Sequence, residues 1–445
     1  MEQVCFYFFM KTIILQSLRV VAMNGAQVIF GLISSVILAR ALGPEARGIY
    51  AMITLVAGTM AMLCNPGIYA SANYHMSTGR WNKAQGLGTV MAVTCGFAAV
   101  AALIAVLVMP LFGASAEVVR EWPIFGSVAV ITAMSIFTTS FNGLFFGSHR
   151  VSAITNWRIA WGGVQCLVFF LLALVVIDLK VFTLATAALS ILDIVGLALL
   201  FCWGERVTMT TNPGLVKDLL RYGIMVYGSR ILLYLGQRLD TFMVLFFLGT
   251  VSLGHYTIAV SFAEQIALLP YSVSMIMMPN LGKLQISESA QMTARVVRYT
   301  LVCVVAMIAT LMLVMPLLIP LMYGEEYRPS VLPFLLLAPG TAAISLFTIM
   351  EPFFQSNHRP HIPLIVTLIG VAANCALNLL LIPRAGMAGA ALAVTVAYML
   401  QLTTACYFFF RWTKLPLHTL FGLRSTLAEM LQYGRDRLYR LQRAS

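Results

Sequence analysis

Long apolar runs are the feature that most constrains how this chain folds. Twelve runs of about 20 mostly apolar residues, separated by short polar connections, take up more than half of the 445 residues. A run of that length crosses the roughly 30 Å hydrocarbon layer of a bilayer as an α-helix. The predicted spans are residues 16–39, 48–70, 87–110, 124–146, 157–177, 181–203, 223–248, 253–276, 297–320, 331–354, 361–382 and 387–410.

Charged residues are too scarce to cover a soluble protein of this size. They make up 10% of the chain, and hydrophobic residues make up 60%, whereas a soluble domain averages about 25% charged residues. The apolar runs are continuous, which is not the alternating pattern of membrane β-strands. We therefore expect an all-α polytopic membrane protein with 12 transmembrane helices. A soluble enzyme or a nucleic-acid-binding domain is not expected.

Lysine and arginine are unequally distributed between the two sides of the predicted membrane. With a cytoplasmic N-terminus, 19 of the 28 fall in cytoplasmic segments, counting Arg158 and Arg298 at the cytoplasmic edges of their spans. Six fall in outside connections, and Arg19, Arg230 and Arg238 lie within spans. Positive residues accumulate in cytoplasmic loops. Both termini are therefore predicted to be cytoplasmic. The tail interleaves basic and apolar residues, which is typical of an interfacial helix on anionic lipid.

Motifs of the first half of the chain recur in order in the second half. The Leu-Gly and Gly-x-Tyr pairs at 42–50 recur at 248–256, the run at 107–111 recurs at 313–317, and His149-Arg150 recurs as His358-Arg359. An offset near 206 maps the first span onto the seventh. This predicts two six-helix bundles related by a pseudo-twofold axis along the membrane normal, a transporter architecture. The predicted divisions are an N-terminal bundle at 1–206, a cytoplasmic linker at 207–222, a C-terminal bundle at 223–411 and a basic, amphipathic cytoplasmic tail at 412–445.

Polar residues share one face of the predicted seventh span. At 100° per residue, one stripe about 100° wide contains Tyr227, Arg230, Tyr234, Gln237, Arg238 and Thr241. The two arginines are about 12 Å apart along the axis, and we expect both at mid-membrane depth, where charge is usually functional. Guanidinium forks match phosphate oxygens. The stripe therefore predicts an anionic ligand, with a diphosphate as the natural candidate. In the first span, Asn24 and Gln27 share a face and are expected to line the same cavity.

A second interpretation is that each arginine pairs with a carboxylate of another span. Asp193, Glu264 and Glu351 are available, while Asp240 falls off the stripe. Paired charges also mark transport paths, so both interpretations stay open. Enzyme motifs such as a P-loop, a nucleophile elbow or HExxH are absent, and eight scattered cysteines form no CxxC pair. We expect no catalytic residues, no metal site and no bound cofactor.

Three segments resemble the polysaccharide flippase family, the O-antigen or Wzx-type branch of the multidrug/oligosaccharidyl-lipid/polysaccharide (MOP) superfamily. They are residues 38–50, residues 237–279, and residues 378–392 with their Asn-Leu-Leu-Leu-Ile-Pro-Arg run. The resemblance implies two six-helix bundles around a cationic cavity, with Arg230 and Arg238 as its cations. It makes Asp240 and Glu264 candidates for coupling to a proton or sodium gradient.

The resemblance also implies an activity. Such a protein flips undecaprenyl-diphosphate-linked oligosaccharide from the cytoplasmic to the periplasmic leaflet of a bacterial inner membrane, with a polysaccharide polymerase and a chain-length regulator as partners. The alternatives are a cation-coupled multidrug exporter of the same superfamily and a membrane-embedded polymerase. The first favours a cavity rich in carboxylates, which the first span lacks, and the second needs a large outside loop, which is missing.

Overall fold

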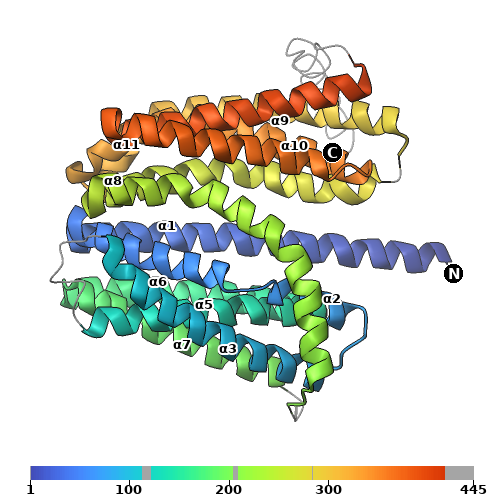
Figure 1. The fold of residues 1–445 in the computed structure, drawn as a ribbon, viewed down its shortest axis with the longest axis horizontal. Coiled ribbons are helices and arrows are strands. Elements are labelled where there is room, and N and C mark those ends of the chain that lie inside the picture. Colours follow the sequence, from blue (N-terminus) through green and yellow to red (C-terminus); the bar gives the residue numbers. More distant parts are fainter. Residues whose placement is uncertain (1, 113–121, 204–208, 283, 416–445) are drawn as a thin grey trace, which may run out of the picture. The chain divides into compact units, whose positions relative to one another are not determined.

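The computed structural model describes residues 2–112, 122–203, 209–282 and 284–415, and within them it consists of helices joined by short connections, with no strand. Among these residues, side chains are described from residue 25 onward, apart from 112, 229, 276, 279 and 280. The elements (Figure 1) are α1 (Glu2–Leu63), α2 (Ile68–Ser77), α3 (Lys83–Val108), the 3-10 helix η1 (Met109–Phe112), α5 (Trp122–Gly147), α6 (Val151–Val175), α7 (Leu179–Cys202), α8 (Pro213–Leu281), α9 (Ile286–Tyr323), the 3-10 helix η2 (Glu325–Ser330), α10 (Val331–Ser356) and α11 (His361–Thr413). The predicted all-α class is confirmed.

Nine helical stretches among the described residues are long and apolar enough to cross a membrane. Three of them, Gly25–Leu63, Arg230–Met275 and His361–Thr413, have 39, 46 and 53 residues, far more than one crossing needs. A straight helix of 53 residues would be about 80 Å long, so within one bilayer it has to fold back. The polytopic membrane class is confirmed, and twelve crossings stays a prediction.

Each long helix bends at one glycine. Gly43 in α1, Gly249 in α8 and Gly386 in α11 have φ values of 72°, 78° and 58°. This left-handed conformation is free of steric penalty only for glycine. In α11 the two arms lie side by side, because Gly370 of the first arm packs against the Gln401 side chain of the second.

The sequence repeat is also a structural repeat. Gly43 and Gly249 are 206 positions apart and share nearly the same backbone angles, with ψ values of 176° and −172°. His149 and His358 are 209 positions apart and have φ values of 57° and 58°. The repeated motifs are therefore the points at which the two halves of the chain turn in the same way.

Two close approaches of backbone to backbone follow the same offset. A Cβ on Gly48 would overlap the carbonyl oxygen of Thr250, and a Cβ on Gly254 would lie 2.8 Å from the carbonyl oxygen of Pro44. Pro44 and Gly48 become Thr250 and Gly254 when 206 is added. The two contacts are therefore a reciprocal, locally twofold pair, and glycine is needed in both because no side chain fits.

The chain divides into two compact units. Unit 1 contains Met1–Tyr234, Val244–His255 and Met322–Glu326, and unit 2 contains Leu235–Met243, Tyr256–Leu321 and Tyr327–Ser445. The core of unit 1 includes Phe141, Phe145, Phe201 and Leu219. The core of unit 2 includes Met350, Phe353, Phe354 and Phe409. Because α8 begins at Pro213, most of the predicted linker at 207–222 is helical.

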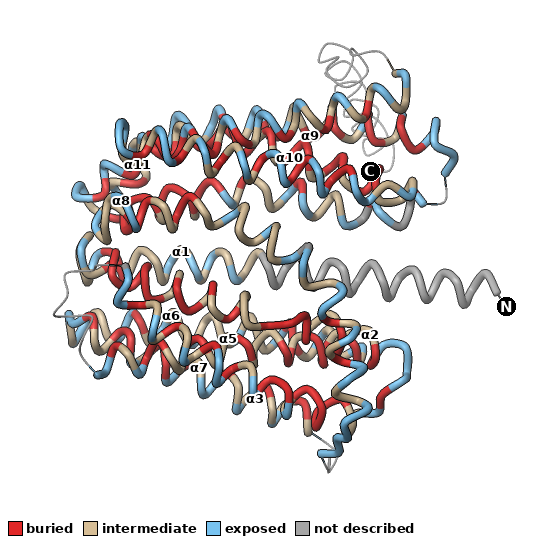
Figure 2. The backbone as a smooth tube through the Cα atoms, in the orientation of Figure 1, coloured by how far each residue is buried: buried red, intermediate tan, exposed pale blue. Residues whose placement is uncertain are grey.

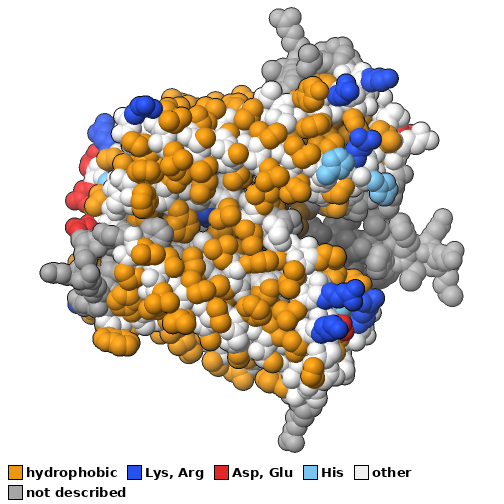
Figure 3. Space-filling model, in the orientation of Figure 1, with side chains coloured by type: hydrophobic (Ala, Val, Ile, Leu, Met, Phe, Trp, Pro, Cys, Tyr) orange, Lys and Arg blue, Asp and Glu red, His pale blue; other side chains and the backbone are white. Residues whose placement is uncertain are grey.

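Apolar side chains cover the outside of both units. Val175, Leu313 and Leu317 are 81%, 78% and 77% exposed, and buried and exposed residues alternate along the helices of each unit (Figure 2). The surface view shows hydrophobic side chains over the lengths of the helices, while charged ones gather at helix ends (Figure 3). This distribution is that of a surface in contact with lipid.

Candidate functional site

The predicted polar stripe of α8 does not form one continuous surface. The Tyr227 hydroxyl donates to the carbonyl oxygen of Leu63, and the hydroxyl oxygens of Tyr234 and Thr59 lie 3.0 Å apart. Both contacts tie α8 to the second arm of α1 within unit 1. Thr241, predicted on the same stripe, is buried. Part of the stripe therefore stabilises helix packing.

Arg230 is the exposed cation of the stripe. Its guanidinium carbon lies 5.3 Å from the centre of the Tyr69 ring, on α2, a cation–π arrangement. Its side chain is exposed, and none of the carboxylates that the structure describes forms an ion pair with it. Arg230 is therefore able to receive an anion without first releasing a carboxylate.

The bend at Gly249 places the two arginines at different depths. At 1.5 Å per residue, Arg238 lies about 16 Å along the helix from the bend, and Arg230 lies about 28 Å from it. The hydrocarbon layer is about 30 Å thick. If the bend lies at one membrane surface, Arg238 is near mid-depth and Arg230 is near the opposite surface. The expectation of two arginines at mid-depth thus applies best to Arg238.

Arg238 forms an ion pair with Glu264, on the far side of the same bend. Its Nη1 lies 3.1 Å from Oε1 of the carboxylate, and the side chains are 34% and 46% exposed. The alternative interpretation from the sequence, a carboxylate partner on another span, therefore holds for Arg238. Because the pair is only partly covered, it remains accessible to a competing anion or proton.

Asp240 lies inside unit 2, and the ion pair of Arg238 is with Glu264 and not with this carboxylate. The carboxylate is 4% exposed; its Oδ2 accepts a hydrogen bond of 2.6 Å from the Tyr256 hydroxyl. The Thr241 hydroxyl lies 3.4 Å from its other oxygen. Among the two candidates for ion coupling, Asp240 is thus the enclosed one and Glu264 the accessible one.

For the remaining predicted site residues, the structure gives only their exposure, or the side chain lies outside the described residues. Gln237 on α8 and Gln27 on α1 are exposed. The side chain of Asn24 lies outside the described residues, as do residues 416–445 of the predicted tail.

A buried charge network in unit 1 was not predicted from the sequence. Arg158 of α6 donates from Nη1 to Oδ2 of Asp193 on α7 at 3.0 Å and from Nη2 to the amide oxygen of Asn142 on α5 at 2.9 Å. Oδ1 of Asp193 accepts from the Trp157 indole at 2.8 Å, and Oδ2 lies 3.3 Å from the Thr138 hydroxyl. Asp193, offered from the sequence as a partner for the arginines of α8, is thus paired within its own unit.

A depth argument would have found this pair. Arg158 lies 17 residues before Val175, where α6 ends, and Asp193 lies 14 residues after Leu179, where α7 begins. Two helices joined by a short loop run antiparallel, so residues at similar distances from the loop lie at similar depths. The sequence-based spans place Arg158 at the cytoplasmic edge of the span 157–177, whereas α6 begins seven residues before Arg158, at Val151.

A buried histidine lies next to the first turns of α8. The His75 ring stacks on Trp81 at 4.4 Å between centres, and the Tyr222 ring of α8 meets it edge-on at 6.0 Å. Burial lowers the pKa of His75 below its ordinary 6.5, while Asp218 opposes the shift. The imidazole is therefore held neutral in an aromatic cluster outside the membrane-spanning segments.

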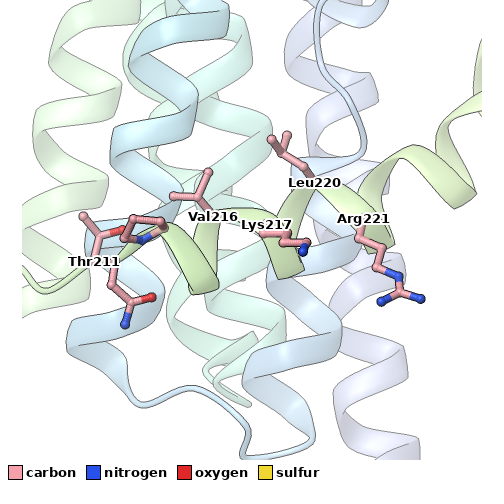
Figure 4. Close-up of a pocket in the computed structure, with 7 residues that line it drawn as sticks. Thr211, Val216, Lys217, Leu220 and Arg221 are labelled. Carbon is pink, nitrogen blue, oxygen red and sulfur yellow. The ribbon is translucent and has the colours of Figure 1, made fainter.

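An open groove runs beside the start of α8 (Figure 4). It has a volume of about 710 Å³, and its lining includes Lys217 and Arg221. These two cations are four residues apart and share one helix face, and Leu219 lies in the core of unit 1. The first turns of α8 are thus amphipathic, as expected of a segment at a membrane surface.

Solved structures with similar folds are transporters of one superfamily. A structure of the lipid II flippase MurJ in an inward closed conformation is 14% identical, with a TM-score of 0.69, over 96% of this chain and 93% of that one. An inward-facing multidrug resistance MATE transporter of the MOP superfamily is 13% identical, with a TM-score of 0.62, over 87% and 94%. A MOP superfamily transporter from Pyrococcus furiosus, described as having a binding pocket of reverse polarity, is 12% identical with a TM-score of 0.55, over 91% and 96%. At such identities the likeness shows the fold alone.

The sequence itself matches a family profile over more than half of its length. The profile, described as polysaccharide biosynthesis protein, matches residues 16–285 of 445. No curated protein matches the chain. The match covers α8 and the part of α1 from residue 16 onward, which carry the predicted site residues. The chain therefore belongs to the polysaccharide biosynthesis protein family, and it has the fold of the MOP-superfamily transporters and flippases.

Proposed function

We propose that this protein flips undecaprenyl-diphosphate-linked oligosaccharide from the cytoplasmic to the periplasmic leaflet of a bacterial inner membrane. The family assignment supports a role in polysaccharide synthesis, and the shared fold supports transport. The single observation that carries the proposal is Arg230. It is an exposed cation at the edge of a membrane span, and no described carboxylate pairs with it.

The chemistry of the two arginines suits a diphosphate. Arg230 meets the anion first, because it lies nearer the predicted cytoplasmic surface. Deeper in the membrane, the diphosphate competes with Glu264 for the Arg238 guanidinium, which it binds with the same forked geometry as a carboxylate. Protonation of Glu264 releases Arg238 for the substrate, so binding and proton uptake favour each other. In the proposed cycle of alternating access, the sugars cross through a polar path and the prenyl chain stays in lipid.

A test in cells compares the loss of Arg230 with the loss of another arginine on the same helix. Arg230→Gln and Arg230→Lys are compared with Arg221→Gln, a matched loss of charge on the same helix but outside the apolar span. At equal protein level, polymer export should fall at least about tenfold in Arg230→Gln and less in Arg230→Lys, because a charge-assisted hydrogen bond is removed or weakened. Arg221→Gln should behave as the original chain. Normal export by Arg230→Gln would overturn the proposal.

A multidrug exporter is the second candidate, favoured by the likeness to MATE transporters and by three carboxylates in the apolar helices of unit 2, Asp240, Glu264 and Glu351. Each of them has a partner, however: Glu264 pairs with Arg238, Asp240 accepts from Tyr256, and Glu351 accepts from the Gln355 amide at 3.3 Å. This leaves little negative charge for a cationic drug. Drug resistance on expression, with no defect in polysaccharide, would favour the exporter.

A further inference from the structure

The turn between α10 and α11 repeats the turn between α5 and α6. In the first, the amides of Ser148, His149 and Arg150 donate to the carbonyl oxygens of residues 144, 146 and 145. In the second, the amides of residues 357, 358 and 359 donate to those of residues 353, 355 and 354. Both histidines have the left-handed φ already described. The arginine that follows each histidine therefore starts from the same backbone.

The two arginines differ in what they contact. Arg150 donates to the carbonyl oxygen of Phe201 at 2.8 Å and lies over the Phe145 ring, so it closes the end of α7. Arg359 instead lies over the ring of Trp412 in the last turn of α11. The next cation, Arg411, is exposed, and unit 1 has Cys202 at the matching position, 209 residues earlier. Unit 2 therefore holds two arginines where unit 1 holds one that serves as a cap.

These arginines line a cavity at the end of unit 2. Its volume is about 540 Å³, and it is lined by Ile286, Asn357, His358, Arg359, Arg411 and Trp412. The lining contains no carboxylate, and no acidic residue of the described chain pairs with Arg359 or Arg411. Basic and histidine side chains gather on the surface at this end of unit 2 (Figure 3). The cavity is therefore a concentrated and unneutralised positive site.

Helix ends place the cavity at a membrane–water boundary. The apolar helix α10 ends at Ser356, and α11 begins at His361 and returns to Thr413 on the same side. Tryptophan prefers the level of lipid headgroups. A cation pair beside an interfacial tryptophan is the environment that a lipid phosphate occupies.

We propose that this cavity binds the phosphate of an anionic phospholipid in the adjoining leaflet, which is the cytoplasmic leaflet by the distribution of basic residues. Arg359 and Arg411 hold the phosphate oxygens. Trp412 fixes the Arg359 guanidinium and packs against the glycerol region. A volume of this size accommodates one headgroup. The proposal does not depend on which cargo the protein transports.

The test measures lipid binding to the purified full-length chain in a neutral detergent. Phosphatidylglycerol and phosphatidylcholine are titrated separately, and bound lipid is counted by native mass spectrometry. One basic residue near a lipid surface contributes about fivefold to affinity. Arg411→Gln should therefore weaken phosphatidylglycerol binding about fivefold, and the double variant Arg359→Gln/Arg411→Gln about 25-fold. Binding of phosphatidylcholine should be weak in all cases.

Arg384→Gln is the matched control. Arg384 is exposed near the bend at the other end of the α11 arms, and its loss should change phosphatidylglycerol binding less than about twofold. If the loss of Arg359 disturbs Trp412 and unfolds the double variant, the single variant Arg411→Gln still tests the proposal. Unchanged affinity in Arg411→Gln, or an equal loss in Arg384→Gln, would overturn the proposal.

Competition identifies the source of the phosphate. Millimolar inorganic phosphate and glycerol 3-phosphate should displace little bound phosphatidylglycerol, because they lack the acyl chains that hold the lipid at the boundary. Full displacement by inorganic phosphate would overturn the assignment to a lipid and point to a free anion.

Discussion

The buried ion pair of unit 1 offers the sharpest test of how this membrane fold is held together. The side chains of Arg158 and Asp193 are 10% and 6% exposed, and their charged atoms are 3.0 Å apart. Removing one partner of such a pair leaves a buried charge without compensation, which costs about 3–5 kcal/mol. We therefore expect Arg158→Gln and Asp193→Asn each to lower the free energy of unfolding by about 3–5 kcal/mol.

The double variant distinguishes a true interaction from two separate losses. In Arg158→Gln/Asp193→Asn no charge is left, and the two amides remain able to hydrogen-bond to each other and to Trp157 and Asn142. The double variant should therefore lose at least about 2 kcal/mol less than the sum of the single losses.

The assay is unfolding of the purified protein by SDS in mixed micelles, followed by helical circular dichroism. Gln165→Ala, a polar substitution elsewhere on α6, serves as the control. Single losses below about 1 kcal/mol, or a double loss equal to the sum, would refute the reasoning.

Three further predictions follow from other contacts. Gly48→Ala should lower the free energy of unfolding by about 1–3 kcal/mol, because the new Cβ meets a backbone carbonyl. Gly96→Ala, where the Cβ enters open space, should be neutral or stabilising. Equal effects of the two substitutions in the unfolding assay would contradict this. The pKa of His75 is lowered in the folded state, so the unfolded chain binds more protons, and the free energy of unfolding should fall as the pH drops below about 6.5. His75→Phe should flatten this part of the plot of stability against pH. An unchanged plot would refute the assignment. The side chains of Arg238 and Glu264 are about a third to a half exposed. Neutralising either residue should therefore change the free energy of unfolding by less than about 1 kcal/mol, but it should slow transport. A stability loss of several kcal/mol would show instead that the pair is structural.

The helical membrane class could be predicted because it depends on composition and on runs of residues. So could the repeat, because its glycines are required by backbone conformation. Gly43 and Gly249 have to adopt positive φ, and Gly48 and Gly254 have to leave room for a carbonyl. Such requirements restrict a position to one residue type, which makes them visible in a single sequence.

The partners of buried charges were harder to predict. A helical projection gives the direction of a side chain but not the helix that it meets. It placed Asp240 off the stripe, in agreement with its bond to Tyr256. It gave no reason to choose Glu264 rather than Asp193 as the partner of Arg238, because that choice depends on how α8 folds back at Gly249.

The bend also explains why one stripe contributes to two kinds of contact. Tyr227 and Tyr234 bond to α1, whereas Arg238 pairs across the bend of its own helix. Sequence reasoning treated the residues of the stripe as equivalent because it had no partner helices to assign to them. Their separation into packing residues and accessible cations follows from tertiary contacts alone.

The most direct test of the proposed activity is lipid translocation by the purified protein in liposomes. A fluorescent oligosaccharide linked to undecaprenyl diphosphate is placed in both leaflets, and its accessibility to an external quencher is followed in time. The proposal predicts that the protein speeds the exchange between leaflets and that Arg230→Gln slows it at least about tenfold, while Arg221→Gln leaves it unchanged. Exchange no faster than in protein-free liposomes, or equally fast with Arg230→Gln, would contradict it.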